Sequence, residues 1–166
     1  MRAVGIILAG GNSNKMRELT NKRAVAAMPI AGSYRAIDFA LSNMSNSHIQ
    51  KVAVLTQYNA RSLNEHLSSS KWWDFGRKQG GLYVFTPTIT ADNGYWYRGT
   101  ADAIYQNLDF LRKCHEPYVI ITSGDAVYKM DYNKVLEYHI SQGRHDHYHR
   151  DAGIWRREKM RHALEL

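Results

Sequence analysis

Residues 4–11 read VGIILAGG, a short apolar run that ends in two glycines. A continuous apolar segment of this length is typical of a strand buried on both faces of a parallel sheet. The glycines that follow carry no Cβ, so their backbone N–H groups can approach a phosphate closely. This stretch therefore predicts a first strand that runs directly into a phosphate-binding loop, with a simple tight turn as the alternative.

Strands and helices are predicted to alternate along the rest of the chain. Apolar runs predict strands over residues 51–58, 81–87 and 118–122. Apolar residues at helical spacing predict helices over residues 33–46, 60–67, 100–114 and 132–140. Ser33, Thr100 and Asp131 are the predicted N-caps of three of these helices. Such alternation favours an α/β fold with a doubly wound, mainly parallel sheet.

Polar residues and glycines follow three of the predicted strands, at the edge where such sheets bind ligands. These strand ends carry Gly10 and Gly11, then Gln57 and Tyr58, and finally residues 123–125, SGD. A carboxylate at Asp125 can hold Mg²⁺ between nucleotide phosphates, and a helix cap is the alternative. Residues 95–103, YWYRGTADA, can stack a base and donate N–H groups at a helix start, or simply pack aromatic rings on the core.

The composition narrows the class of protein. The chain has 166 residues, of which 44% are hydrophobic, which is enough for one domain with a real core. Its formal charge of +7 comes from scattered basic residues, which favours phosphorylated small molecules over nucleic acid as ligands. The N-terminal apolar run is too short for a membrane span or a signal segment. The single cysteine, Cys114, forms no intrachain disulfide, so we expect a cytoplasmic protein with a buried thiol.

The tail, residues 143–166, departs from the pattern of residues 1–142. Its alternating histidines, His145, His147 and His149, indicate a metal site, and a solvated irregular tail is the plainer alternative. A third interpretation comes from the genetic code. Residues 145–150 read HDHYHR, and their possible codons can be read in a frame shifted by one base. In that frame the first codon encodes Met or Thr, and each of the next four encodes Ile or Thr. Because such β-branched residues suit a strand, we favour a frameshifted or cloning-altered tail.

Five segments together resemble the family of glucose-1-phosphate adenylyltransferase, also called ADP-glucose pyrophosphorylase. They are LAGG…LTNKRA, SYRAIDFALSN, TQY, YWYRGTADAIYQNLDF and SGDAVYKMDY, between residues 4 and 142. The resemblance implies a nucleotide-diphospho-sugar transferase (Rossmann-like) fold. It also implies the reaction of ATP with α-glucose 1-phosphate to give ADP-glucose and pyrophosphate, for glycogen biosynthesis. The family continues into more catalytic domain and a C-terminal β-helix, so we expect an N-terminal fragment with a truncated fold.

The resemblance implies roles for particular residues. Those that border the nucleotide are Leu8, Ala9, Gly10, Gly11, Gln57, Gly99, Thr100 and Ala101. Tyr97 faces the glucose phosphate, Asp125 holds Mg²⁺, and Lys15 stands where the family has a catalytic arginine. The basic positions that the family links to effector binding match Lys22, Arg23 and Arg35.

The phosphate loop departs from the family pattern, which reads Gly-Gly-x-Gly-x-Arg-Leu and then Arg-Ala-Lys-Pro-Ala. Ser13 replaces the third glycine, Lys15 the arginine and Val25 the lysine. Lysine keeps the charge but loses the planar guanidinium, whereas valine loses the charge entirely. We therefore expect a chain that binds better than it catalyses, similar to the accessory D-type subunit that joins a catalytic subunit in a hetero-tetramer. A competent enzyme that uses Lys15 and a non-enzymatic sensor of nucleotide or sugar phosphate are the alternatives.

Overall fold

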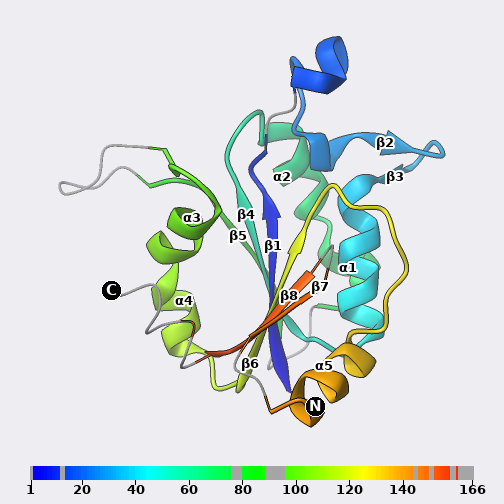
Figure 1. The fold of residues 1–166 in the computed structure, drawn as a ribbon. Coiled ribbons are helices and arrows are strands. Elements are labelled where there is room, and N and C mark those ends of the chain that lie inside the picture. The colour runs from blue at the N-terminus through cyan, green and yellow to red at the C-terminus, as the bar shows by residue number, and fades with distance from the viewer. Residues whose placement is uncertain are drawn as a thin grey trace.

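The computed structural model describes residues 2–11, 14–75, 80–88, 96–143, 146–149, 152–157 and 160. For residues 14, 15, 70, 71, 146–149 and 152 it describes the backbone alone. Six strands of this part form one sheet: β1 (Ala3–Ala9), β4 (Lys51–Thr56), β5 (Gly81–Phe85), β6 (Tyr118–Ser123), β7 (Asp146–His149) and β8 (Ala152–Arg156). Their order across the sheet is β5-β4-β1-β6-β8-β7 (Figure 1).

The sheet is mainly parallel, as predicted. Strand β1 lies at its centre and pairs in parallel with both β4 and β6, and β4 pairs in parallel with β5. Strand β8 runs antiparallel to β6 and to β7. A small separate hairpin joins β2 (Pro29–Ile30) to β3 (Tyr34–Arg35).

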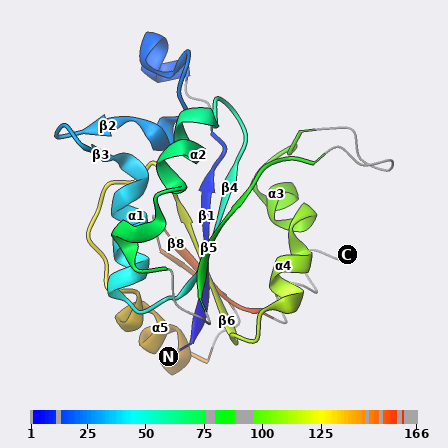
Figure 2. The ribbon, with the colours of Figure 1, turned by 180° about the vertical axis from the view of Figure 1, so that it is seen from behind.

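Helices cover both faces of the sheet, which confirms the doubly wound α/β class. One face carries α1 (Ala36–Asn46), α2 (Arg61–Leu67) and α5 (Tyr132–Ser141), and the other carries α3 (Thr100–Gln106) and α4 (Leu108–Lys113) (Figure 2). The residues of β1 divide between these layers by the two-residue period of a strand. Val4 and Ile6 pack in the cluster of α3 and α4, and Ile7 packs with α1, α2 and α5. Both faces of β1 are thus buried, which explains why its sequence is apolar without alternation.

Two predicted N-caps, Ser33 and Thr100, are wrong, although the helices themselves form. The first helix begins at Ala36, because the Asp38 carboxylate accepts the Arg35 N–H at 2.9 Å, and Ser33 lies in the turn between β2 and β3. The helix predicted over residues 100–114 begins at Thr100 itself, so Thr100 is not its cap. By contrast, the Asp131 side chain accepts the Asn133 N–H at 3.0 Å, which confirms that cap.

The predicted helix over residues 100–114 is also interrupted. Asn107 separates α3 from α4 and has φ −111° and ψ 20°, outside the helical range. Its side-chain Nδ2 donates to the Ala103 carbonyl at 2.8 Å. A side chain that bonds a nearby backbone group in this way competes with the helix for that group.

The tail forms two strands, so an irregular tail is wrong for residues 146–149 and 152–156. Ile154 of β8 is buried and pairs in register with Ile120 of β6. The predicted histidine metal site lies outside the described side chains, since His145 is not described and the other two histidines have only backbone described. Among the described residues, no three His, Cys, Asp or Glu side chains group to hold a metal ion. No described helix is both long and apolar enough to cross a membrane.

One buried asparagine fastens the segment between β6 and α5 to α1. Asn43 is 5% exposed, and its Nδ2 donates to the Tyr128 carbonyl at 3.0 Å. The Met130 N–H donates back to Asn43 Oδ1 at 3.2 Å. Directly after α1, Ser47 Oγ accepts the Tyr132 N–H at 2.9 Å. The segment that begins with Asp125 is therefore held by both the donor and the acceptor of one amide.

We expect Asn43→Ala to lower the free energy of unfolding by about 1–3 kcal/mol, because it leaves a partly buried carbonyl and a partly buried N–H without this partner. Urea unfolding monitored by circular dichroism would measure the change. Asn46→Ala is the matched control, because Asn46 is exposed on the same helix. Its effect should stay within about 0.5 kcal/mol. Equal losses in the two variants would contradict the role assigned to Asn43.

Candidate functional site

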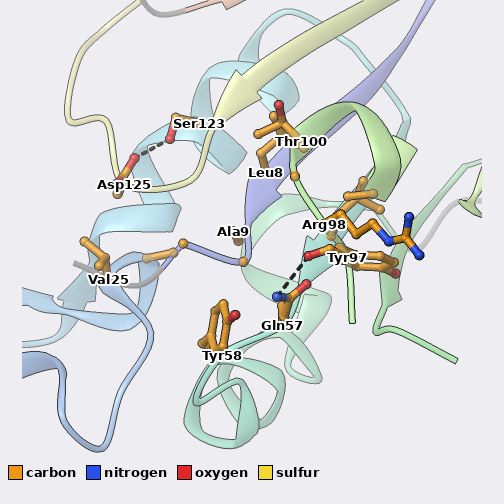
Figure 3. A pocket seen from close by; sticks show the side chains of 16 residues that line it. Leu8, Ala9, Val25, Gln57, Tyr58, Tyr97, Arg98, Thr100, Ser123 and Asp125 are labelled. Carbon is orange, nitrogen blue, oxygen red and sulfur yellow. Dashed lines mark hydrogen bonds between the residues drawn. The ribbon is translucent and has the colours of Figure 1, made fainter. Parts of the chain in front are cut away.

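A cavity of about 550 Å³ opens at the carboxyl ends of β1, β4 and β6 (Figure 3). Its size suits a nucleotide-sized ligand. The end of β1 supplies four predicted residues to the lining: Leu8, Ala9, Gly10 and Gly11. Gln57 follows β4, Asp125 follows β6, and the turn before α3 supplies Tyr97, Gly99 and Thr100. In Figure 3, Asp125 and Val25 lie on one side of Ala9, and Tyr97, Arg98 and Thr100 lie on the other.

Two glycines allow the strand ends to approach one another. A Cβ at Gly10 would lie 3.1 Å from the Cβ of Gln57, so the end of β1 fits against β4 only without a side chain there. At Gly124, a Cβ would meet the Cβ of Ala9 at 3.1 Å and that of Ala26 at 3.3 Å. The Gly124 N–H also donates to the Leu8 carbonyl at 2.9 Å, which extends the pairing of β6 with β1.

This close approach places Asp125 at the cavity. Its carboxylate is exposed and accepts a hydrogen bond from Ser123 Oγ. Asp125 is the one carboxylate among the described lining residues. In phosphoryl-transfer sites Mg²⁺ is bound by one or two carboxylates together with substrate phosphates, so this donor set fits that ion. The ion would supply neutralisation of phosphate charge next to Asp125.

The turn before α3 forms the opposite wall. The Arg98 N–H donates to Asp102 Oδ2 at 2.8 Å, and Gln106 Nε2 donates to the same oxygen at 2.9 Å. Gln57 Nε2 reaches across to the Tyr97 carbonyl at 3.4 Å, which ties the end of β4 to this turn. Thr100 begins the helix, and both it and Gly99 line the cavity.

Aromatic residues add to this wall. Burial raises the pKa of the Tyr97 phenol, while a hydrogen bond from Asn107 lowers it and the charge of Asp102 raises it. The net shift is upward, so the phenol is a neutral hydrogen-bond donor at physiological pH. Tyr58, at the end of β4, stacks on Trp96 with ring centroids 5.2 Å apart. Because Tyr58 lines the cavity, a flat aromatic surface lies at its edge.

The predicted cations are distributed unevenly. The Lys15 side chain and the whole of Ser13 lie outside the described part of the chain. Lys22 and Arg23 are exposed after the 3₁₀ helix Asn14–Thr20. Arg35 is half-buried, and its guanidinium donates to the Ser62 carbonyl and, at 3.1 Å, to Ser62 Oγ. Of the predicted residues with described side chains, these three basic residues and Ala101 do not line the cavity.

Several residues that line the cavity were not among the predicted binding residues, and Val25 was noted only because it replaces a lysine of the resembled family. Val25 and Ala26 belong to the 3₁₀ helix Val25–Ala27 and line the wall beside Asp125. Leu55 and Ala103 come from the interiors of β4 and α3. The signal for Leu55 is its place two residues before Gln57, which directly follows β4, since alternate residues of an extended chain share a face. Arg98 stood inside a quoted motif and is the one cation whose described side chain lines the cavity.

The comparisons with known proteins agree with this arrangement. The family described as "Nucleotidyl transferase" matches residues 4–153, so the chain belongs to that family. It is 48% identical over 136 residues to the glucose-1-phosphate adenylyltransferase of Clostridium novyi, which covers 82% of this chain and 36% of the relative. The corresponding protein of Bacillus cytotoxicus is 48% identical over 139 residues, covering 84% of this chain and 37% of the relative. The chain thus spans about a third of the length of these curated relatives.

We expect Gly124→Ala to destabilise the protein by about 1–3 kcal/mol, because the added methyl group forces Ala9 or Ala26 to move. Gly11→Ala is the matched control, since a Cβ at Gly11 meets no described atom within 4 Å. Urea unfolding of both variants would test this. A Gly124→Ala protein as stable as the Gly11→Ala control would contradict the tight fit of β6 against β1.

Proposed function

We propose that this chain is a subunit of a glucose-1-phosphate adenylyltransferase, which converts ATP and α-glucose 1-phosphate to ADP-glucose and pyrophosphate in glycogen biosynthesis. The observation that carries the proposal is the cavity, because residues from five matching motifs of the sequence meet there or pack behind it. The names of the curated relatives support the same substrates.

The reaction places particular demands on the cavity. An oxygen of the sugar phosphate attacks the α-phosphorus of ATP, the bond to the bridging oxygen breaks, and pyrophosphate leaves with that electron pair. Negative charge accumulates on phosphate oxygens, so N–H groups and cations near them stabilise the transition state. The backbone of Gly10 and Gly11 can donate to the phosphates, and the wall of Tyr58, Gln57 and Gly99 can border the base.

We further propose that this chain catalyses weakly and serves a catalytic partner as a regulatory subunit of a hetero-tetramer. The supporting residue is Val25, whose side chain lines the cavity where the resembled family has lysine. An isopropyl group offers no charge and no hydrogen bond to a phosphate. Removal of one donor to a developing oxyanion costs about 10²–10³ in rate in well-studied enzymes. Lys15 in place of arginine adds to that loss because lysine lacks the bidentate fork.

Pyrophosphate release from ATP, Mg²⁺ and glucose 1-phosphate tests both proposals: that the chain belongs to an adenylyltransferase, and that it is a weakly catalytic, regulatory subunit. We expect little release by the protein alone and an increased rate when it is mixed with a catalytic adenylyltransferase subunit. Release by the protein alone at a rate typical of the partner, and lost in Lys15→Ala, would establish a competent enzyme instead. ATP binding with no association and no stimulation would establish a sensor.

We expect Val25→Lys to raise pyrophosphate release by the protein at least tenfold, because it returns a cation to the cavity wall. The control is Ile140→Lys, which adds the same charge at an exposed position near the end of α5. A similar rate in both variants and the wild type would mean that position 25 does not limit catalysis.

A further inference from the structure

Asn107 lies at the break between α3 and α4 and contacts the phenol of Tyr97. Tyr97 is the residue of the cavity wall that is predicted to face the sugar phosphate. Its Nδ2 lies 3.0 Å from the Tyr97 hydroxyl oxygen and 2.8 Å from the Ala103 carbonyl oxygen. Both partners are half-buried or buried, as is Asn107 itself. No role in binding follows for Asn107 from the motifs discussed above.

The second contact fixes the orientation of the amide. A backbone carbonyl can only accept a hydrogen bond, so Nδ2 rather than Oδ1 must face Ala103. The same nitrogen carries a second hydrogen, which is directed at the Tyr97 oxygen. The phenolic oxygen is therefore the acceptor in this pair, and its own hydrogen must point elsewhere.

Other contacts hold the rest of Tyr97 in place. Gln57 Nε2 donates to its backbone carbonyl at 3.4 Å, and the following N–H, that of Arg98, is bound by Asp102 at 2.8 Å. The ring packs against the cluster that contains Leu108 and Ile104. With its backbone and ring held, the direction of the hydroxyl hydrogen depends on the group at its tip.

We propose that Asn107 is a positioning residue that makes the Tyr97 hydroxyl a hydrogen-bond donor to a phosphate oxygen of the sugar phosphate. The inference rests on the proposed function, because it takes that ligand as the occupant of the cavity. The role proposed for Asn107 also explains the break in the helix, because at the break the Asn107 side chain contacts both Ala103 and Tyr97. The upward shift of the Tyr97 pKa agrees with it, because the phenol keeps its proton.

Asn107→Asp changes the shape little and reverses the contact with Tyr97, and both Asn107→Asp and Asn107→Ala lose the hydrogen bond to the Ala103 carbonyl. A carboxylate only accepts, so the Tyr97 hydroxyl turns to donate to it and is lost to the ligand. We expect the dissociation constant for glucose 1-phosphate, measured by titration calorimetry, to rise about ten- to a hundredfold. Asn107→Ala leaves the hydroxyl free to donate, so its affinity should fall less than that of Asn107→Asp. A purely structural role predicts the opposite order or equal losses.

The added charge of Asn107→Asp could itself repel a phosphate, and a double-mutant cycle with Tyr97→Phe separates the two effects. If Asn107 acts through the hydroxyl, Asn107→Asp causes a much smaller loss of affinity once Tyr97 is Phe, and the loss that remains measures the charge repulsion. Losses that simply add would overturn the inference. So would an Asn107→Ala variant that binds as weakly as Asn107→Asp.

The titration of Tyr97 gives a readout that needs no ligand. In protein with ¹³C-labelled tyrosine, the resonance absent from Tyr97→Phe identifies the phenol. Its pKa should rise in Asn107→Ala, because the hydrogen bond that lowers it is removed. An unchanged pKa would overturn the contact itself. The pKa of Tyr97 could rise in Asn107→Ala while the wild-type protein does not bind glucose 1-phosphate. That result would overturn the proposed function, and the inference with it.

Discussion

The parallel pairing of β1 with β4 on one side and β6 on the other is the constraint on which the candidate site depends. Ala9 pairs with Thr56, and Leu8 pairs with Ser123, so three chain segments leave the sheet at one edge. A slip of one residue in either register would turn the side chains of that strand to the opposite face. The close fit at Gly124 also requires this register. The cavity is thus a direct product of strand alignment, and the loops add only its walls.

The cavity separates the requirements of binding from those of catalysis. A base and a sugar can be bordered by aromatic rings, glycine backbone and amides, all of which the lining offers. Acceleration of phosphoryl transfer depends instead on charged donors aimed at oxygens where charge develops. Val25 bears on the second requirement, because its side chain lines the cavity and carries no charge. Under the proposed function, the fold keeps its cavity while one uncharged side chain in the wall weakens the chemistry.

Strand positions, and the edge of the sheet that carries the cavity, followed from the sequence because burial on both faces makes strands such as β1 continuously apolar. The predicted helix boundaries are wrong where a side chain competes with the backbone for a hydrogen bond, or where segments distant in the sequence pair. Asn107 interrupts a helix whose apolar spacing continues through it, and the pairing of Pro29 with Arg35 moves the start of α1 past Ser33. The strands of the tail depend on contact with β6, which no local pattern reveals. In the site, Ala103 could not be predicted because its place on the cavity follows from how α3 packs against the sheet, and the role of Lys15 stays a prediction.

The central place of β1 has a consequence for the order of folding during synthesis. Ala3 pairs with Tyr118, so β1 acquires its second neighbour only after the long segment between these two residues has been made. Contacts between residues so distant in sequence form slowly, because a long loop must close first. Until then, β1 can pair only with β4. The edge of β1 that later pairs with β6 exposes unpaired backbone N–H and C=O groups to other chains. The time that the ribosome needs to translate the segment between β4 and β6 therefore sets how long this unpaired edge of β1 is exposed in the cell.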